Sequence, residues 1–167
     1  MKRYTPEHLK GFKNNEEGLI VCPAGDYTEI KSFPERCSFE AGCSFGERCS
    51  FGAECSFGER CSFGERCRFA ESCHFGSECR FEGGHIAAPG YPLLIFSGFG
   101  SANRTTYAFN CTDGIVIRCG CFSGSLEEFR EKVRERNGNM PFAIEYLAVA
   151  DLIERRFSRE GEGNGKR

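Results

Sequence analysis

The sequence lacks several features that would assign it to a well-defined class. It has no tryptophan, only 2 methionines in 167 residues, and a formal net charge of −2. A charge so close to zero gives no support for nucleic-acid binding or for acidic mimicry of a nucleic acid. The longest apolar runs, such as Leu93 to Phe96, are far too short to span a bilayer. The sequence therefore predicts neither a membrane nor a nucleic-acid partner.

The N-terminal segment also lacks a secretory pattern, because no apolar stretch follows the basic residues after Met1. We therefore expect a cytoplasmic protein. In that compartment the 12 cysteines are expected to be reduced thiols rather than a disulfide framework.

A repeat of six residues dominates what is present. Phenylalanine stands at every sixth position from Phe33 to Phe81, and a cysteine stands two residues before each from Phe39 onward. This period fits neither a helix nor a heptad. It suits a short strand, Cys-Ser-Phe, with Cys and Phe inside and Ser outside. Gly-Glu-Arg then forms a corner in which Gly supplies the unusual dihedrals. Three such sides predict a triangular coil of 18 residues.

The unit Phe-Gly-Glu-Arg-Cys-Ser resembles the hexapeptide repeat of left-handed parallel β-helix proteins, over about residues 19–86. It departs from that repeat in having Phe for the usual aliphatic residue and Cys for the usual small one. The resemblance implies a mainly β fold: a short left-handed parallel β-helix, built as a triangular solenoid of fewer than four coils. Extending the phase upstream places Tyr27 and Val21 in the interior. Residues 1–18 are then an N-terminal cap, with apolar contacts from Leu9 and Phe12.

The outward position before each Phe changes in the last coil. It is Ser in the earlier coils and becomes Arg68, His74 and Arg80 on the three faces. These residues are candidates for interaction. They form either a basic collar for an acidic partner or polar contacts with the next domain. The second interpretation is favoured, because a ring spread over three faces is poor geometry for one ligand.

A second module follows a linker at residues 87–92, which is rich in Pro and Gly. Residues 93–157 are predicted to be a small α+β domain with three strands followed by two helices. Ser125 begins a capping box for the first helix, which is expected to stop at Asn137-Gly138. The second helix is expected to be largely buried. Residues 158–167 are expected to be a disordered tail. The strands are expected at Leu93–Phe99, Arg104–Asn110 and Gly114–Phe122.

Three cysteines of this domain are weak candidates for a metal site. Cys119 and Cys121 could bind zinc together with Cys111 and a fourth ligand. Their spacing is not that of a zinc ribbon, and no histidine follows His85. Packing in a core is the stronger interpretation, so no metal and no cofactor are expected.

The second half also resembles a segment of uncharacterised phage and prophage proteins. The resemblance is carried by Tyr107-Ala-Phe-Asn, Ile117-Arg-Cys-Gly-Cys-Phe and Leu126-Glu-Glu-Phe-Arg. It implies a mobile-element origin and hence the cytoplasm of a bacterial host. We therefore expect a non-enzymatic accessory protein that binds a host or virion protein, with inhibition of a host defence system as one outcome.

The alternative function comes from the other resemblance. Hexapeptide acyltransferases commonly use a histidine at a subunit boundary, which would here be His74 or His85. The few coils, their near-identical units and the absence of an inserted loop argue against catalysis.

We expect a homo-oligomer, a dimer assembled through residues 93–157.

Overall fold

The structure is a computed structural model that describes residues 1–162. It divides the chain into two compact units, one spanning Met1–Pro89 and one beginning at Gly90. Within residues 1–162, no helix has the length and apolar character needed to cross a membrane.

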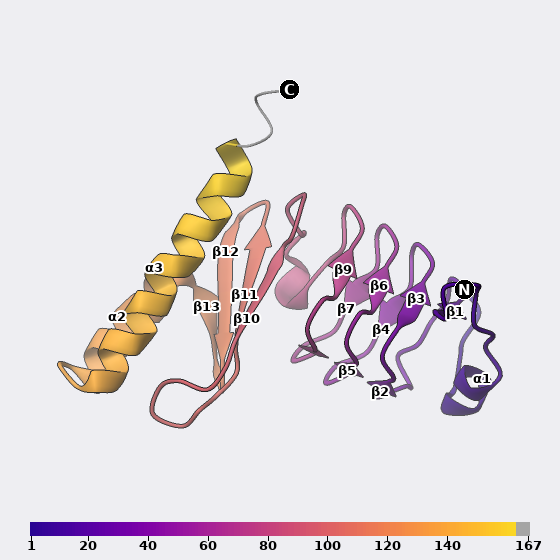
Figure 1. The fold of residues 1–167 in the computed structure, drawn as a ribbon, viewed down its shortest axis with the longest axis horizontal. Coiled ribbons are helices and arrows are strands. Elements are labelled where there is room, and N and C mark those ends of the chain that lie inside the picture. The colour runs from indigo at the N-terminus through magenta and orange to yellow at the C-terminus, as the bar shows by residue number, and fades with distance from the viewer. Residues whose placement is uncertain (163–167) are drawn as a thin grey trace. The chain divides into compact units, whose positions relative to one another are not determined.

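The first unit is a parallel β-solenoid of about three turns, with about 18 residues in each turn (Figure 1). Its short strands pair in three parallel ladders, in the orders β1-β3-β6-β9, β2-β5-β8 and β4-β7. Partners lie 18 residues apart, as in Phe39↔Phe57, so the six-residue period is confirmed as one side of a coil. The strands are β1 (Ile20–Cys22), β2 (Ser32–Phe33), β3 (Cys37–Phe39), β4 (Ser44–Phe45), β5 (Ser50–Phe51), β6 (Ser56–Phe57), β7 (Ser62–Phe63), β8 (Arg68–Phe69) and β9 (His74–Phe75).

The repeated phenylalanines form the solenoid core. Within a ladder their rings stack nearly parallel, with Phe57 centred 5.2 Å from Phe39 and 5.1 Å from Phe75. Between ladders the rings meet edge to face, as Phe57 does with Phe63 at 4.8 Å. Both geometries are favourable for aromatic pairs. Each ring in the middle of the stack therefore contacts aromatic neighbours above, below and beside it.

The corners differ from expectation in where the unusual dihedrals lie. The left-handed residue is the one just before each Cys, as at Arg48 (φ 56°), Glu54 (φ 57°) and Arg60 (φ 57°). Gly52 has no such φ, but a Cβ built on it would collide with the backbone of Glu35 in the coil above. At Gly52 the absence of a side chain therefore allows the corners to stack closely, although Ala70 occupies the equivalent position one coil later. The expectation that the glycine after Phe supplies the unusual dihedrals is wrong.

The N-terminal cap continues one ladder of the solenoid. Arg3 bridges Asp26 in parallel, and the ring of Tyr4 stacks on Tyr27 at 4.8 Å. Phe12 packs edge to face against both rings. Tyr4 is thus the main apolar contact of the cap, and the sequence reasoning missed it.

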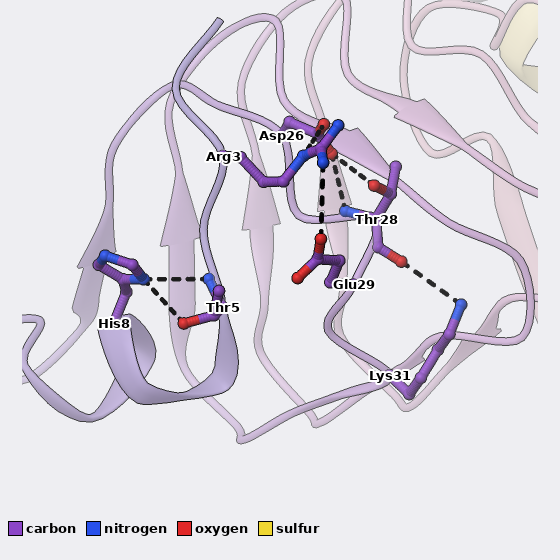
Figure 2. Close-up of polar contacts among 7 residues, drawn as sticks. All are labelled: Arg3, Thr5, His8, Asp26, Thr28, Glu29 and Lys31. Atoms are coloured by element: carbon purple, nitrogen blue, oxygen red, sulfur yellow. Dashed lines mark hydrogen bonds and ion pairs between the residues drawn. The ribbon is translucent and has the colours of Figure 1, made fainter.

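Polar contacts anchor this cap (Figure 2). The Arg3 side chain donates to an Asp26 carboxylate oxygen at 3.3 Å, and the other oxygen of Asp26 accepts from the Thr28 hydroxyl at 2.6 Å. The hydrogen bonds from Thr28, and to a smaller extent the one from Arg3, lower the pKa of Asp26. In helix α1 (Pro6–Lys10), the Thr5 backbone N–H donates to Nδ1 of His8 at 3.1 Å. The cap is therefore held by local as well as ladder contacts.

The regular phase changes at both ends of the solenoid. Upstream of Tyr27 it slips by one residue, so Cys22 is fully buried while Val21, expected inside, is 36% exposed. Downstream, the 3-10 turn η1 (Glu82–Gly84) reverses the chain. Ile86 then pairs antiparallel with Arg80, the last outward residue of its ladder.

The second unit is a four-stranded antiparallel sheet with two helices. Its strands lie in the order β10-β11-β12-β13. The sheet has one strand more than expected, because the chain turns at Gly120 (φ 62°), within the segment that was predicted to be a single long strand. Helix α3 continues through Glu162, so the expectation of disorder is wrong for residues 158–162, and residues 163–167 lie outside the described part. The elements are β10 (Leu93–Phe96), β11 (Thr106–Cys111), β12 (Gly114–Cys119), β13 (Phe122–Ser125), α2 (Leu126–Asn137) and α3 (Pro141–Glu162).

The core of this unit lies between the sheet and the two helices. Ala108 and Ile117 of the sheet are buried with Phe129 of α2 and Ile153 of α3. The predicted capping box is confirmed, since the Glu128 backbone N–H donates to the Ser125 hydroxyl at 3.2 Å and the Ser125 N–H donates to the Glu128 carboxylate at 2.7 Å.

One arginine joins the two helices. Arg130 of α2 is only 8% exposed. Its guanidinium donates to Asp151 at 2.9 Å and to Glu154 at 2.7 Å, both on α3. A buried cation needs such partners, so this cluster fixes the register of α2 against α3.

Candidate functional site

The three predicted interaction residues are exposed but do not come together. Arg68 ends the ladder β2-β5-β8, and His74 ends the ladder β1-β3-β6-β9. Arg80 follows Ser62 in the third ladder. Each continues a column that is Ser in the previous coil. The structure therefore places one basic residue on each side of the last coil rather than assembling a single site.

The repeat cysteines have a common local role in the interior. Each thiol donates a hydrogen bond to a corner carbonyl. The acceptor lies three residues earlier in the same coil, as for Cys49 and Gly46 at 3.1 Å, or in the preceding coil, as for Cys67 and the same Gly46 oxygen at 3.2 Å. Contact with the next thiol of the column and burial raise the pKa of Cys79. Contact with the thiols of Cys37 and Cys73 instead lowers the pKa of Cys55 to about 4, so the shifts along a column differ in sign. The repeat thiols fill the interior and hydrogen-bond to corner carbonyls.

The three metal candidates of the second unit are kept apart. Cys119 pairs with Thr106 and Cys111 pairs with Gly114, at opposite ends of the β11–β12 ladder, a separation of roughly 16 Å at the strand rise. Cys121 is exposed in the turn before β13. Burial raises the pKa of Cys111 to about 12. Among the described residues, no group of three or more His, Cys, Asp and Glu side chains is arranged to hold a metal ion.

The two histidines of the alternative function lie in different structural contexts. His74 is exposed on β9. His85 is half-buried and follows η1, and its carbonyl accepts from the Phe81 backbone N–H at 2.8 Å. The chain reverses there, so His85 begins a return segment rather than a further coil.

Helix α3 carries an apolar stripe on the side opposite its core contacts. Ile144 is 67% exposed and Leu152 is 53% exposed, and Ala148 lies one helical turn from each. Tyr146, Ala150 and Ile153 occupy the buried side. The expectation that this helix is largely buried is therefore wrong for what we call the α3 stripe: Ile144, Ala148 and Leu152.

A cavity of about 230 Å³ lies within the second unit. Phe122, Phe129 and Tyr146 form its apolar part, and the cationic side chains lining it are those of Arg104, Lys132 and Arg136. We call it the basic cavity. Of the described residues, none that lines it is acidic.

Sequence reasoning did not find the basic cavity or the α3 stripe. Lys132 and Arg136 are four residues apart in the predicted first helix, so their shared face was visible in the sequence. Nothing in the sequence brought Arg104, from the segment before β11, to that face. Ile144 and Leu152 were assigned to the core because apolar residues occur on both sides of α3.

Comparisons with known proteins identify no relative: no family model, curated protein or solved structure matches the chain.

Proposed function

We propose that this chain is a non-enzymatic interaction protein in which the solenoid is a rigid spacer and the second unit mediates self-association. The observation that carries the proposal is the α3 stripe, because contiguous exposed apolar side chains at helical spacing are typical of an interface. The solenoid supports the spacer role. Its interior is a continuous stack of rings, and its sides repeat an outward Ser in every coil before the last.

The occupant proposed for the α3 stripe is the α3 stripe of a second copy. In an antiparallel pair centred on Ala148, Ile144 of one copy lies opposite Leu152 of the other, because both are four residues from the centre. Ala148 allows the two backbones to approach closely at the centre. A two-fold dimer of this kind is self-complementary without any other partner.

Light scattering on the full chain tests this proposal. The wild-type protein is expected to be a dimer, and the double variant Ile144→Ser/Leu152→Ser a folded monomer. Val21→Ser, which removes an exposed apolar side chain from the solenoid, is the matched control and should remain dimeric. A monomeric wild-type protein, or a dimer that survives the double substitution, contradicts the proposal.

The acyltransferase alternative has a separate test. Acetyl-CoA binding by the purified chain, weakened by His74→Gln or His85→Gln, would favour an enzyme and contradict the non-enzymatic proposal. The binding of a host or virion protein, and the inhibition of a host defence system, rest on the phage resemblance alone.

We also propose that the coils are left-handed and triangular. The support is the match of the unit Phe-Gly-Glu-Arg-Cys-Ser to the hexapeptide pattern, together with the three parallel ladders of the solenoid. A crystal structure with right-handed coils would contradict this.

A further inference from the structure

We propose that the basic cavity is a binding site for a small anion with a flat apolar body, such as an aryl phosphate or an aryl carboxylate. The proposal concerns a surface different from the α3 stripe and does not depend on self-association.

The apolar part of the basic cavity suits a flat ring. Phe122 and Phe129 are tilted against each other with centroids 5.6 Å apart, and Phe129 meets Tyr146 edge to face at 5.9 Å. Phe129 and Tyr146 are only 4% and 6% exposed, whereas Phe122 is half-buried. An aromatic ligand would therefore pack mainly against the exposed part of the Phe122 ring, which the other two rings support from behind. Binding in this cavity is favoured because it removes the apolar surface of the ligand from water.

Close contacts hold the segment that carries Arg104 against α3. The Gly100 backbone N–H donates to the Glu145 carboxylate of α3 at 2.6 Å, and a Cβ at Gly100 would collide with the Tyr146 ring. These contacts hold the segment before β11, which carries Arg104, against α3. Arg104 in turn lies against the backbone of Gly120, where a Cβ would come within 2.6 Å of its guanidinium nitrogen. Arg104 therefore packs directly against the turn at Gly120, and its segment is fixed by the contacts of Gly100 with α3.

The charges at the cavity favour an anion. Arg104, Lys132 and Arg136 come from two separate segments and converge on one cavity. The ion pair from Lys132 to Glu135 is long, at 3.7 Å, and both side chains are substantially exposed, so it contributes little. Arginine matches the oxygens of phosphate and carboxylate groups by donating two hydrogen bonds at once.

Two features restrict the ligand to a small molecule. The volume of about 230 Å³ is below the roughly 300–1,000 Å³ of pockets for drug-sized ligands. Beside it, across Lys132 and Phe122, lies a second hollow lined by Glu128, Glu131 and Glu135. Those carboxylates would repel a polyanion that extended beyond the basic cavity. A short aryl anion fits both limits, whereas a nucleic acid does not.

The test is a calorimetric titration of the full chain with phenyl phosphate. We expect a Kd on the order of 0.1–1 mM, in keeping with a ligand of about eleven non-hydrogen atoms. The double variant Arg104→Gln/Arg136→Gln should weaken binding by about tenfold or more, as expected for loss of charged hydrogen bonds. Arg159→Gln is the matched control, because it removes an exposed arginine roughly 20 Å along α3 from Tyr146.

Three further ligands separate the contributions. Benzyl alcohol lacks the charge and inorganic phosphate lacks the ring, and each is expected to bind at least about tenfold more weakly than phenyl phosphate if both parts of the cavity are used. Single-stranded DNA should not compete. The proposal is overturned by an absence of phenyl phosphate binding, by unchanged affinity in the double variant, by equal affinity for benzyl alcohol or inorganic phosphate, or by DNA that displaces the ligand.

Discussion

The solenoid and the second unit bury aromatic side chains in different ways. In the solenoid, Phe57 contacts rings that are 6, 12 or 18 residues away along the chain, such as Phe63, Phe69 and Phe75. In the second unit, Phe129 contacts Tyr146 of another helix and Phe122 of the sheet, with no fixed spacing. A periodic sequence therefore specifies both which side chains are inside and which neighbours they meet. In the second unit, helical and strand periods specify only the inward face.

The two units also differ in how exposed surface arises. Before the last coil, the outward position ahead of each repeat Phe is Ser, and the hydroxyls hydrogen-bond along a column, as Ser56 does to Ser38 at 3.2 Å. The second unit leaves Ile144 and Leu152 largely exposed and forms a cavity between loop, sheet and helix. A repeat gives every side the same surface, whereas an irregular α+β unit can concentrate binding chemistry in one place. This contrast is why both of our functional proposals fall in the second unit.

The strongest test of the comparison is a charge in the centre of the stack. Phe57→Asp should unfold the solenoid, because an unpaired carboxylate would replace a ring with aromatic neighbours on several sides, at a cost of about 4 kcal/mol or more. Thermal unfolding followed by circular dichroism measures this. Ser56→Asp is the matched control one residue away, where the side chain points outward, and it should stay folded. A cooperatively folded, soluble Phe57→Asp protein would show that the stacked rings are not the core.

Much of the solenoid could be predicted because local period and neighbours coincide there. Prediction failed where the period did. Cys22 replaces Val21 inside because the first coil is one residue shorter, and Tyr4 joins the stack from a segment without the repeat. In the second unit, helix caps such as Ser125 could be predicted since they depend on neighbours in sequence. The basic cavity could not, because Arg104 reaches it only through tertiary packing.

An intermediate effect is expected at the corners. Gly52→Ala should destabilise the solenoid by about 1–3 kcal/mol, because the added methyl group would collide with the Glu35 backbone of the coil above. Glu54→Gly in the same corner is the contrasting variant. It relieves a left-handed conformation (φ 57°) and should change stability by less than about 1 kcal/mol. Chemical denaturation of both variants decides which corner residue is constrained. Equal effects, or a larger loss at Glu54, would contradict our account of the corner.

The smallest effect on stability is expected for a substitution of Cys121 in the second unit. The exposure of this thiol contrasts with the burial of the repeat thiols in the solenoid. Cys121 is exposed, whereas the repeat cysteines are buried except for the half-buried Cys73. A thiol reagent added to the native protein should therefore modify about one thiol rapidly and the others slowly, because attack requires an accessible thiolate. All 12 should react after unfolding. Cys121→Ser should abolish the rapid phase without changing the unfolding midpoint, since the side chain supports no core. Rapid native modification of several repeat cysteines would instead mean that the solenoid opens readily, and would weaken the claim that its stacked interior forms a rigid spacer.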